Sequence, residues 1–483
     1  MKSSQKLTLA VAVALALAAC GKKEEAPKPA AAPAGAAGVT VTIAHAGPLT
    51  GSIAHLGKDD ENGVALAVAQ ANDKKITIGG QPVTFKMMSE DDQADPKVGT
   101  TVAQKLVDAK VAAVIGHLNS GVTIPASEIY NKAGIPVISG SATNPALTER
   151  GLKTVFRTVG RDDQQGPAIA SYIANELKGK KVAIVDDKTA YGEGIANEVE
   201  KTLKGAKVSV VGRDDQQGPA IAQYLNNMKI KKVAIADDAT AYGEGLANEV
   251  EKTLKAAGVQ VVAREKATDK TTDFKAILTK MKGKNPDVIF YGGMDATGGP
   301  MIKQARELGI KSVFSFGDGA CTDEMAKLAG AAAEGLICSQ AGLPASAASQ
   351  SFNDAFKAKY GEVKQYAPFF YDAVGIMIAA MQKADSTDPA KFVPEISKIK
   401  YNGATGVIEF DEKGDRKNAE ITIFTLKDGK IVPVGVVKAG KASTYDDFMK
   451  EMKTASAAPA AAPAATPAPA PATPPSPAEA PKK

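Results

Sequence analysis

Short apolar runs rich in β-branched residues alternate with amphipathic segments along most of the chain. The run VTVTIAHA (39–46) precedes a helical pattern through NGVALAVAQAN, and VAAVIGHL and IPVISG follow in the same rhythm. This alternation predicts βαβ units and a mainly parallel sheet. The later runs VIFYGG and VFSFGD extend a second sheet. We therefore expect an α/β fold of two doubly wound lobes, with a ligand at the carboxyl ends of the strands.

The segment VGRDDQQGPAIA occurs twice, at residues 159–170 and 211–222. Each copy opens a helix-strand-helix-strand unit, at 159–210 and at 211–262. Two copies are too few for a solenoid, which needs several stacked units to build a continuous core. The repeat therefore predicts one lobe enlarged by an extra unit.

The first residues read as an export signal. Lys2 and Lys6 precede an apolar run that ends in Leu-Ala-Ala-Cys20. We interpret 1–20 as a signal peptide whose ending resembles a lipobox, so that Cys20 carries a lipid anchor. The alternative is simple cleavage after an alanine. We therefore expect an exported, periplasmic protein. No later stretch is apolar enough to span a bilayer, so the lipid would be its membrane anchor.

Segments at both ends lack an apolar period. Residues 21–38 predict a flexible linker, and 454–483, almost entirely Ala, Pro, Ser and Thr, predict a disordered tail. If Cys20 takes the lipid, Cys321 and Cys338 can form a disulfide in an oxidising compartment. The alternative is two buried free thiols.

Composition and motifs exclude several functions. The net charge is only +5, and the basic residues form no stripe along the sequence, so nothing indicates nucleic-acid binding. The three histidines lack metal-ligand spacing, and we expect no catalytic residue, metal or cofactor. The pairs Gly192/Gly194 and Gly243/Gly245 resemble the start of a dinucleotide-binding motif. Asparagine stands at the third glycine position in both copies, which argues against such a site.

Polar side chains follow several predicted strands. Ser120 lies after a strand and before a helix, and Ser141 and Thr143 occupy the equivalent position after the next strand. Such positions suit a carboxylate. Asp318 follows another strand between two glycines and would suit an ammonium group. Together these groups predict a site for a zwitterion. We expect one such site and not two, because Ser120, Thr143 and Asp318 lie outside the repeat.

Several motifs in fixed order carry a family resemblance: GHLNSGVTIPASEIYNKAGIPVIS, GSATNPALTERG, FRTVGRDDQQGPAIA, DDKTAYGEGIANE, VIFYGGMDA and EFDEKGDRKN. From about Val39 to about Val437 the chain resembles the leucine/isoleucine/valine-binding family, the periplasmic receptors of ABC importers for branched-chain amino acids. The resemblance implies a type I periplasmic binding protein whose lobes close on an amino acid about a three-strand hinge. It implies a first lobe of 39–158 and 340–403, a second of 159–339 and 404–453, docking on a membrane permease, and a monomer.

The resemblance also implies roles for single residues. The Ser120 and Thr143 hydroxyls and the Ser141 backbone, in a loop with Ala142, would hold the α-carboxylate, and Asp318 the α-ammonium. Tyr366 would form an aromatic wall, whereas Leu56 and Met294 stand where well-known members have Tyr, which makes the pocket more aliphatic. The tyrosine of AYGEG is either Tyr191 or Tyr242. We favour Tyr242, because the second copy runs directly into the remaining strands.

Three alternatives stay open at this point. The same fold can serve as a sensor for an amide or an aromatic acid. A dinucleotide-dependent enzyme is disfavoured by the missing glycines and by export. The duplication itself could also have abolished binding.

Overall fold

The computed structural model describes residues 38–177, 181–205, 209–211, 271–284, 288–438 and 441–457 of the 483-residue chain. The predicted signal peptide with Cys20, the linker up to residue 37, nearly all of the second repeat copy with Tyr242, and the tail from residue 458 lie outside these residues. In the part described, no helix is both long enough and apolar enough to cross a membrane.

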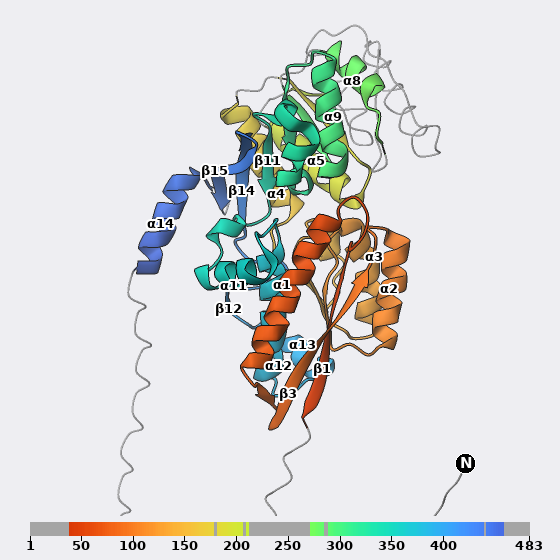
Figure 1. The fold of residues 1–483 in the computed structure, drawn as a ribbon, viewed down its shortest axis with the longest axis vertical. Coiled ribbons are helices and arrows are strands. Elements are labelled where there is room, and N and C mark those ends of the chain that lie inside the picture. Colours follow the sequence, from red (N-terminus) through yellow and green to blue (C-terminus); the bar gives the residue numbers. More distant parts are fainter. Residues whose placement is uncertain are drawn as a thin grey trace, which may run out of the picture. The chain divides into compact units, whose positions relative to one another are not determined.

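The first half of the chain forms a six-stranded sheet. Its order is β2 (Thr77–Ile78), β3 (Gln81–Asp91), β1 (Val39–Gly47), β4 (Ala113–Gly116), β5 (Val137–Ser139) and β6 (Val155–Arg157). All neighbouring strands are parallel except β2 and β3. The helices of this lobe are α1 (Ala54–Asp73), α2 (Pro96–Asp108), α3 (Ser120–Lys132), α11 (Gln350–Tyr360), α12 (Ala367–Lys383) and α13 (Pro389–Ile396), with the short turn η1 (Pro145–Leu147). Figure 1 shows α2 and α3 on one face of this sheet and α1, α12 and α13 on the other.

Among the residues that the structure describes, the second sheet has eight strands. Its order is β16 (Lys441–Thr444), β15 (Lys430–Lys438), β14 (Glu420–Lys427), β11 (Ile337–Gln340), β10 (Val313–Phe316), β9 (Val288–Gly292), β7 (Lys181–Asp186) and β8 (Ser209–Val211). From β8 to β11 the neighbours are parallel, but β14, β15 and β16 join antiparallel. The second lobe is therefore a mixed sheet, and our expectation of a parallel sheet holds for only part of it.

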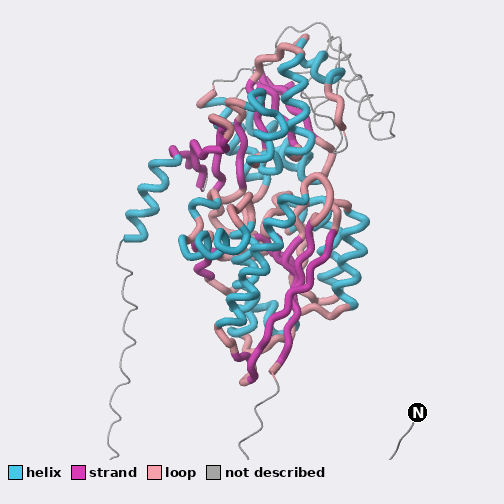
Figure 2. Tube along the Cα trace, viewed as in Figure 1, coloured by secondary structure: helices cyan, strands magenta, loops and turns pink. Residues whose placement is uncertain are grey.

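Helices enclose the strands of the second sheet as well (Figure 2). They are α4 (Asp162–Asn175), α5 (Ala190–Gly205), α8 (Lys275–Lys282), α9 (Asp295–Glu307) and α10 (Asp323–Ala329), with the short turns η2 (Asp318–Ala320), η3 (Gly330–Ala333) and η4 (Ala345–Ala347). Helix α14 (Tyr445–Ala457) extends away from the edge of the sheet, and its Phe448 packs against Val436 of β15 (Figure 1). Alternation along β7 explains the two layers, since successive side chains of a strand point to opposite faces. Ile184 packs in the same core as α4 and α5, whereas Val185 packs with α9 and α10.

Local sequence sets where several helices begin. The Asp95 carboxylate accepts hydrogen bonds from the backbone N–H of Lys97 and Val98 at the start of α2, and Pro96 occupies the first turn. Asp388 and Ser349 cap α13 and α11 in the same manner. These side chains satisfy N–H groups that have no partner within the helix.

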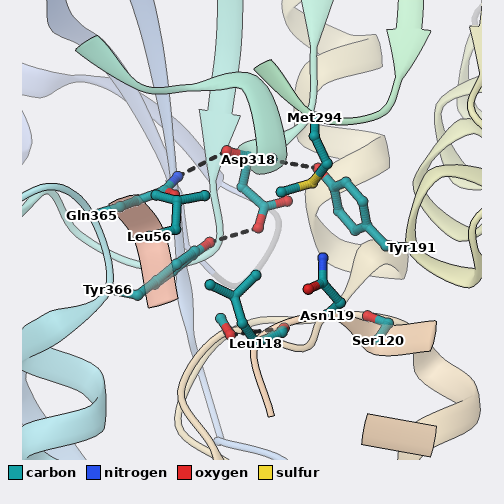
Figure 3. A pocket seen from close by; sticks show the side chains of 11 residues that line it. Leu56, Leu118, Asn119, Ser120, Tyr191, Met294, Asp318, Gln365 and Tyr366 are labelled. Carbon is teal, nitrogen blue, oxygen red and sulfur yellow. Dashed lines mark hydrogen bonds between the residues drawn. The ribbon is translucent and has the colours of Figure 1, made fainter. Parts of the chain in front are cut away.

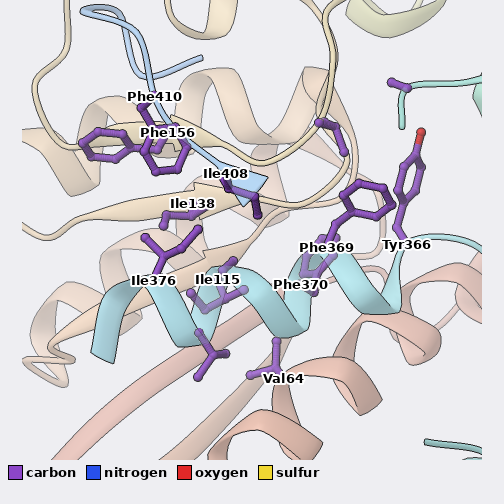
Figure 4. Packing of buried hydrophobic residues seen from close by; sticks show 14 of the residues in the cluster. Val64, Ile115, Ile138, Phe156, Tyr366, Phe369, Phe370, Ile376, Ile408 and Phe410 are labelled. Atoms are coloured by element: carbon purple, nitrogen blue, oxygen red, sulfur yellow. The ribbon is translucent and has the colours of Figure 1, made fainter. Parts of the chain in front are cut away.

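Helix α12 lies at the centre of the first lobe. Phe370 and Ile376 of this helix pack against Ile115 and Ile138 of the sheet, and Val64 of α1 lies on its other side (Figure 4). A helix that is apolar nearly all round must be buried. The segment 367–383, APFFYDAVGIMIAAMQK, meets that requirement.

In the described part of the chain, the backbone passes three times between the two sheets. It passes after β6, after β11 and between the small hairpin β12 (Tyr401–Gly403) and β13 (Gly406–Ile408) and strand β14. Two of these passages are joined by buried charges: Arg157 Nε lies 2.6 Å from a carboxylate oxygen of Asp415, and Arg161 Nη1 donates to the other oxygen at 2.6 Å. This arrangement matches the three-strand hinge that the family resemblance implies.

The first repeat copy occupies the body of the second sheet. Its segments form α4, β7, α5 and β8, and β7 pairs directly with β9. Our expectation that the second copy continues into the remaining strands differs from this arrangement, because the strand next to β9 comes from the first copy.

A polar contact joins helices of the two lobes. His55 Nε2 of α1 lies 3.0 Å from Oδ2 of the buried Asp295 of α9, which also accepts a hydrogen bond from the Thr322 hydroxyl at 2.6 Å. Burial lowers the pKa of His55, but the hydrogen bond and charge of Asp295 outweigh it and raise that pKa above its ordinary value of 6.5. The charge of Glu324 adds to the rise, and Lys327 opposes it.

This contact makes stability depend on pH. A raised pKa in the folded state stabilises the protein fully below pH 6.5, and the contribution is lost as the pH rises through the folded-state pKa. We expect His55→Gln to cost at most about 1 kcal/mol of unfolding free energy near pH ~5.5 and almost nothing near pH ~9. Urea unfolding of both proteins at the two pH values measures this difference. An equal cost at both pH values would contradict a charged contact.

The structure joins Cys321 and Cys338 in a disulfide that spans 17 positions and ties the segment after η2 to β11, with Cα atoms 5.3 Å apart. Closing a loop of this length stabilises the folded state by roughly 3 kcal/mol, because it restricts the unfolded chain. We expect the double variant Cys321→Ala/Cys338→Ala to lose stability on that scale in urea unfolding. Reductant should lower the unfolding midpoint of the native protein and leave that of the double variant unchanged. A native midpoint that does not respond to complete reduction would refute the prediction.

Candidate ligand site

A cavity of about 20 Å³ lies where strand ends of both sheets meet (Figure 3). Carboxyl ends of parallel strands share one edge of a sheet, which brings the loops after them together. The lining residues are Leu56, Leu118, Asn119, Ser120, Ser141, Tyr191, Met294, Asp318, Gly319, Gln365 and Tyr366.

Seven of the ten predicted ligand residues line this cavity: Leu56, Ser120, Ser141, Tyr191, Met294, Asp318 and Tyr366. Ala142 and Thr143 are buried in the expected loop but do not line it. The structure brings Tyr191 to the cavity, whereas we favoured Tyr242, which lies outside the described residues. Because the AYGEG motif is identical in the two copies, sequence could not separate them.

Asp318 is the buried charge of the site. Its carboxylate accepts hydrogen bonds from the Tyr366 hydroxyl at 2.8 Å and from Gln165 Nε2 at 3.0 Å. Burial raises the pKa of Asp318 in spite of the hydrogen bonds from Tyr191, Tyr366 and Gln165. A neighbouring cation would stabilise the ionised form of this carboxyl group.

Backbone contacts hold the segment around Asp318. Gln365 Nε2 donates to the Asp318 carbonyl at 2.8 Å, and the Tyr191 hydroxyl accepts from the Gly319 N–H at 2.8 Å. Figure 3 shows Tyr191 and Tyr366 reaching Asp318 from opposite sides. Sequence reasoning missed Gln165 and Gln365. The only sequence signals for a role at the site were that Gln165 lies in the first turn of α4 and that Gln365 directly precedes Tyr366.

The first lobe contributes hydroxyl groups. Ser120 begins α3, and its Oγ accepts from the Asn144 N–H at 3.2 Å. The Ser141 hydroxyl donates to the Leu118 carbonyl at 2.9 Å. Asn119 Oδ1 is buried without a hydrogen-bond partner among the described residues. These groups place donors and acceptors opposite Asp318, at a helix N-terminus that favours negative charge.

Thr143 does not line the cavity. Its side chain is fully buried beside Asp162, whose carboxyl has a pKa raised well above its ordinary range by burial and by the charge of Asp318. The loop itself is held by Arg157, which donates to the carbonyls of Ala142 at 2.7 Å and Asn144 at 3.0 Å. The guanidinium therefore fixes the turn that presents Ser141.

An aliphatic group borders the polar atoms. Leu56 and Leu118 form one buried cluster with Ile53, and Met294 packs against it. Leu56 and Met294 thus lie together, as the predicted aliphatic pocket requires. Sequence reasoning missed Leu118, although it lies two positions before Ser120.

His117 belongs to the scaffold of the first lobe. His117 is fully buried between Asp92 at 2.7 Å and the Tyr130 hydroxyl at 3.0 Å, which gives it a structural role. Within the described residues, no group of three or more His, Cys, Asp or Glu side chains is placed to hold a metal ion.

Comparison with known proteins identifies relatives over most of the chain. The family model described as periplasmic binding protein matches residues 40–215 and 213–430. The leucine-, isoleucine-, valine-, threonine- and alanine-binding protein of Pseudomonas aeruginosa is 33% identical over 387 residues, covering 79% of this chain and 88% of its own. A Leu/Ile/Val-binding protein homolog of Brucella abortus is 34% identical over 384 residues, 79% of this chain and 89% of its own.

Solved structures agree in fold. The leucine-binding protein LivK of Thermotoga maritima superposes with a TM-score of 0.67 at 25% identity, covering 84% of this chain and 99% of its own. The substrate-binding protein LivJ of Streptococcus pneumoniae, solved with isoleucine, gives 0.62 at 27% identity, over 83% and 100% of the two chains. The chain therefore belongs to the periplasmic binding protein family and, within it, to the leucine/isoleucine/valine-binding proteins.

Proposed function

We propose that this protein is an extracytoplasmic receptor that binds a branched-chain aliphatic amino acid between its two lobes and delivers it to an ABC importer. The observation that carries the proposal is the buried Asp318 carboxylate, which faces the Ser120 and Ser141 hydroxyls across an aliphatic cluster. The names of the relatives, which mention leucine, isoleucine and valine, support the same ligand class.

Charge explains selection for an α-amino acid. A buried carboxylate is costly without a counter-charge, and an α-ammonium beside Asp318 would supply it. The α-carboxylate would then lie toward Ser120 at the start of α3. A ligand that lacks either charge would leave a buried polar group unpaired, which costs more than a missing contact.

The apolar walls explain selection for the side chain. Leu56, Leu118 and Met294 offer hydrocarbon and thioether surface, and Tyr366 adds a ring. These groups offer no hydrogen bond beyond the tyrosine hydroxyl, which already binds Asp318. An aliphatic side chain would be preferred over a polar one.

The cavity volume requires movement on binding. A space of about 20 Å³ holds little more than one water molecule. A leucine would enter only when the lobes separate about the three chain passages. The lobes would then close on the bound leucine, which shifts the population toward the closed form. We further propose that Cys20 carries a lipid, that residues 21–38 tether a monomeric receptor to a membrane, and that no residue acts in catalysis.

A thermal-shift screen of the signal-free protein against the twenty amino acids tests this proposal. A ligand of micromolar affinity at millimolar concentration adds about 4 kcal/mol to stability. We expect leucine, isoleucine or valine to raise the melting temperature, and Asp318→Ala to weaken binding by at least ~2 kcal/mol. Asp323→Asn, which removes an exposed acidic group nearby, is the control and should bind as the native protein does. A cooperative melt that no amino acid shifts would refute the proposal.

The duplication supplies its own matched pair of variants. Tyr191→Phe removes the hydroxyl that accepts from Gly319, and we expect about fivefold weaker leucine binding, the scale of one hydrogen bond. Tyr242→Phe makes the same change in the second copy and should leave the dissociation constant unchanged. Titration calorimetry on both variants measures the effect. The reverse result would show that the second copy supplies the tyrosine of the site.

A further inference from the structure

A second and larger cavity of about 460 Å³ lies in the first lobe, away from the candidate ligand site. It is lined by helices α1 and α12, by the segment after α1 and by Tyr401 of β12, and it is open on one side. Its lining residues are Ala67, Gln70, Ala71, Lys74, Lys75, Ile76, Thr77, Tyr371, Val374, Gly375, Ile378, Ala379, Gln382 and Tyr401. None of them lines the first cavity. The volume falls in the range of small-molecule sites.

One part of this cavity is apolar. Small and branched side chains of α1 and α12 lie side by side there, among them Ala71, Val374 and Ile378. The Tyr401 hydroxyl lies against α12 at Gly375. Any larger residue at this position would collide with the tyrosine, because its Cβ atom would overlap the hydroxyl group. The cavity therefore depends on a glycine and on two alanines, Ala67 and Ala71, that keep the space between the helices open.

The polar part of the lining carries positive charge. Lys74 and Lys75 are exposed at the end of α1, and no acidic side chain belongs to the lining. The Tyr371 hydroxyl donates to Gln70 Oε1 at 2.5 Å, which fixes both side chains at the wall. An apolar surface beside two lysines and tyrosine hydroxyls complements a molecule with a hydrocarbon part and an anionic head.

Lys75 allows a controlled test of the charge. It lies just after α1 with a φ of 50°, a conformation that non-glycine residues adopt infrequently, and its N–H donates to the Asn72 carbonyl at 3.1 Å. Lys110 has the same setting after α2, with a φ of 54° and an N–H that donates to the Val107 carbonyl at 2.9 Å, but it does not line the cavity. Both lysines can stabilise a helix C-terminus, so only a ligand contact distinguishes them.

We propose that this cavity is a binding site for a small amphipathic carboxylate, with its hydrocarbon part against α1 and α12 and its charge beside Lys74 and Lys75. Such a molecule would contact only the first lobe. Its site is separate from that of the proposed amino acid, and the two assignments stand or fall independently.

Octanoate is the probe, measured by titration calorimetry on the signal-free protein with and without saturating leucine. We expect saturable binding of one octanoate that leucine does not displace, and much weaker binding of octanol and octylamine. Lys75→Glu should weaken octanoate binding about tenfold, since it replaces an attraction by a repulsion. Ala379→Phe should abolish octanoate binding by filling the cavity.

Lys110→Glu is the matched control and should leave octanoate binding unchanged. The proposal is overturned if the native protein shows no saturable octanoate binding, if Lys110→Glu weakens binding as much as Lys75→Glu, or if leucine displaces the octanoate. The charge variants decide the site even if Ala379→Phe fails to fold. A protein that binds octanoate but no amino acid would refute the proposed receptor function alone.

Discussion

The buried ion pair between Arg157 and Asp415 holds together the parts on which the site depends. Arg157 ends a strand of the first sheet, and Asp415 lies on the last passage toward the second. Two charges in the interior are stable only when their hydrogen-bonding groups are satisfied. The Arg157 Nη groups donate to the carbonyls of Ala142 and Asn144 and to the Thr148 hydroxyl, and Arg161 donates to Asp415. The loop that carries Ser141 is therefore fixed by the same contact that joins two hinge segments.

Asp318 links the opposite side of the site to that hinge. Gln165 of α4 donates to its carboxylate and to Ser339 of β11, and Tyr366 reaches it from the start of α12. Gln165 follows the first passage between the sheets, Ser339 lies just before the second, and Tyr366 follows the second. A ligand bound at Asp318 would therefore act on elements that must move when the lobes open. The proposed specificity and the proposed motion rest on one set of hydrogen bonds.

Much of the architecture could be predicted because apolar runs and helical periods recur so regularly. Ser120, Ser141 and Asp318 each follow such a run, and they meet as the topology requires. Thr143 shares that position but is buried beside Asp162 and does not line the cavity, and such packing is not encoded in a sequence pattern. Gln165 and Gln365 reach the site by long side chains, so their role depends on packing. The antiparallel strands β14, β15 and β16 were missed because alternation alone does not give strand direction.

The closeness of Asp162 and Asp318 has a consequence for protons. Burial and the charge of Asp318 raise the pKa of Asp162 well above its ordinary range, so it is the carboxyl of the pair that burial and repulsion most strongly keep protonated. A fixed positive charge brought next to Asp318 would favour the ionised forms of both groups and drive a proton into solution. Binding of an α-ammonium beside Asp318 would then be coupled to proton release. The heat it releases would vary with the ionisation enthalpy of the buffer.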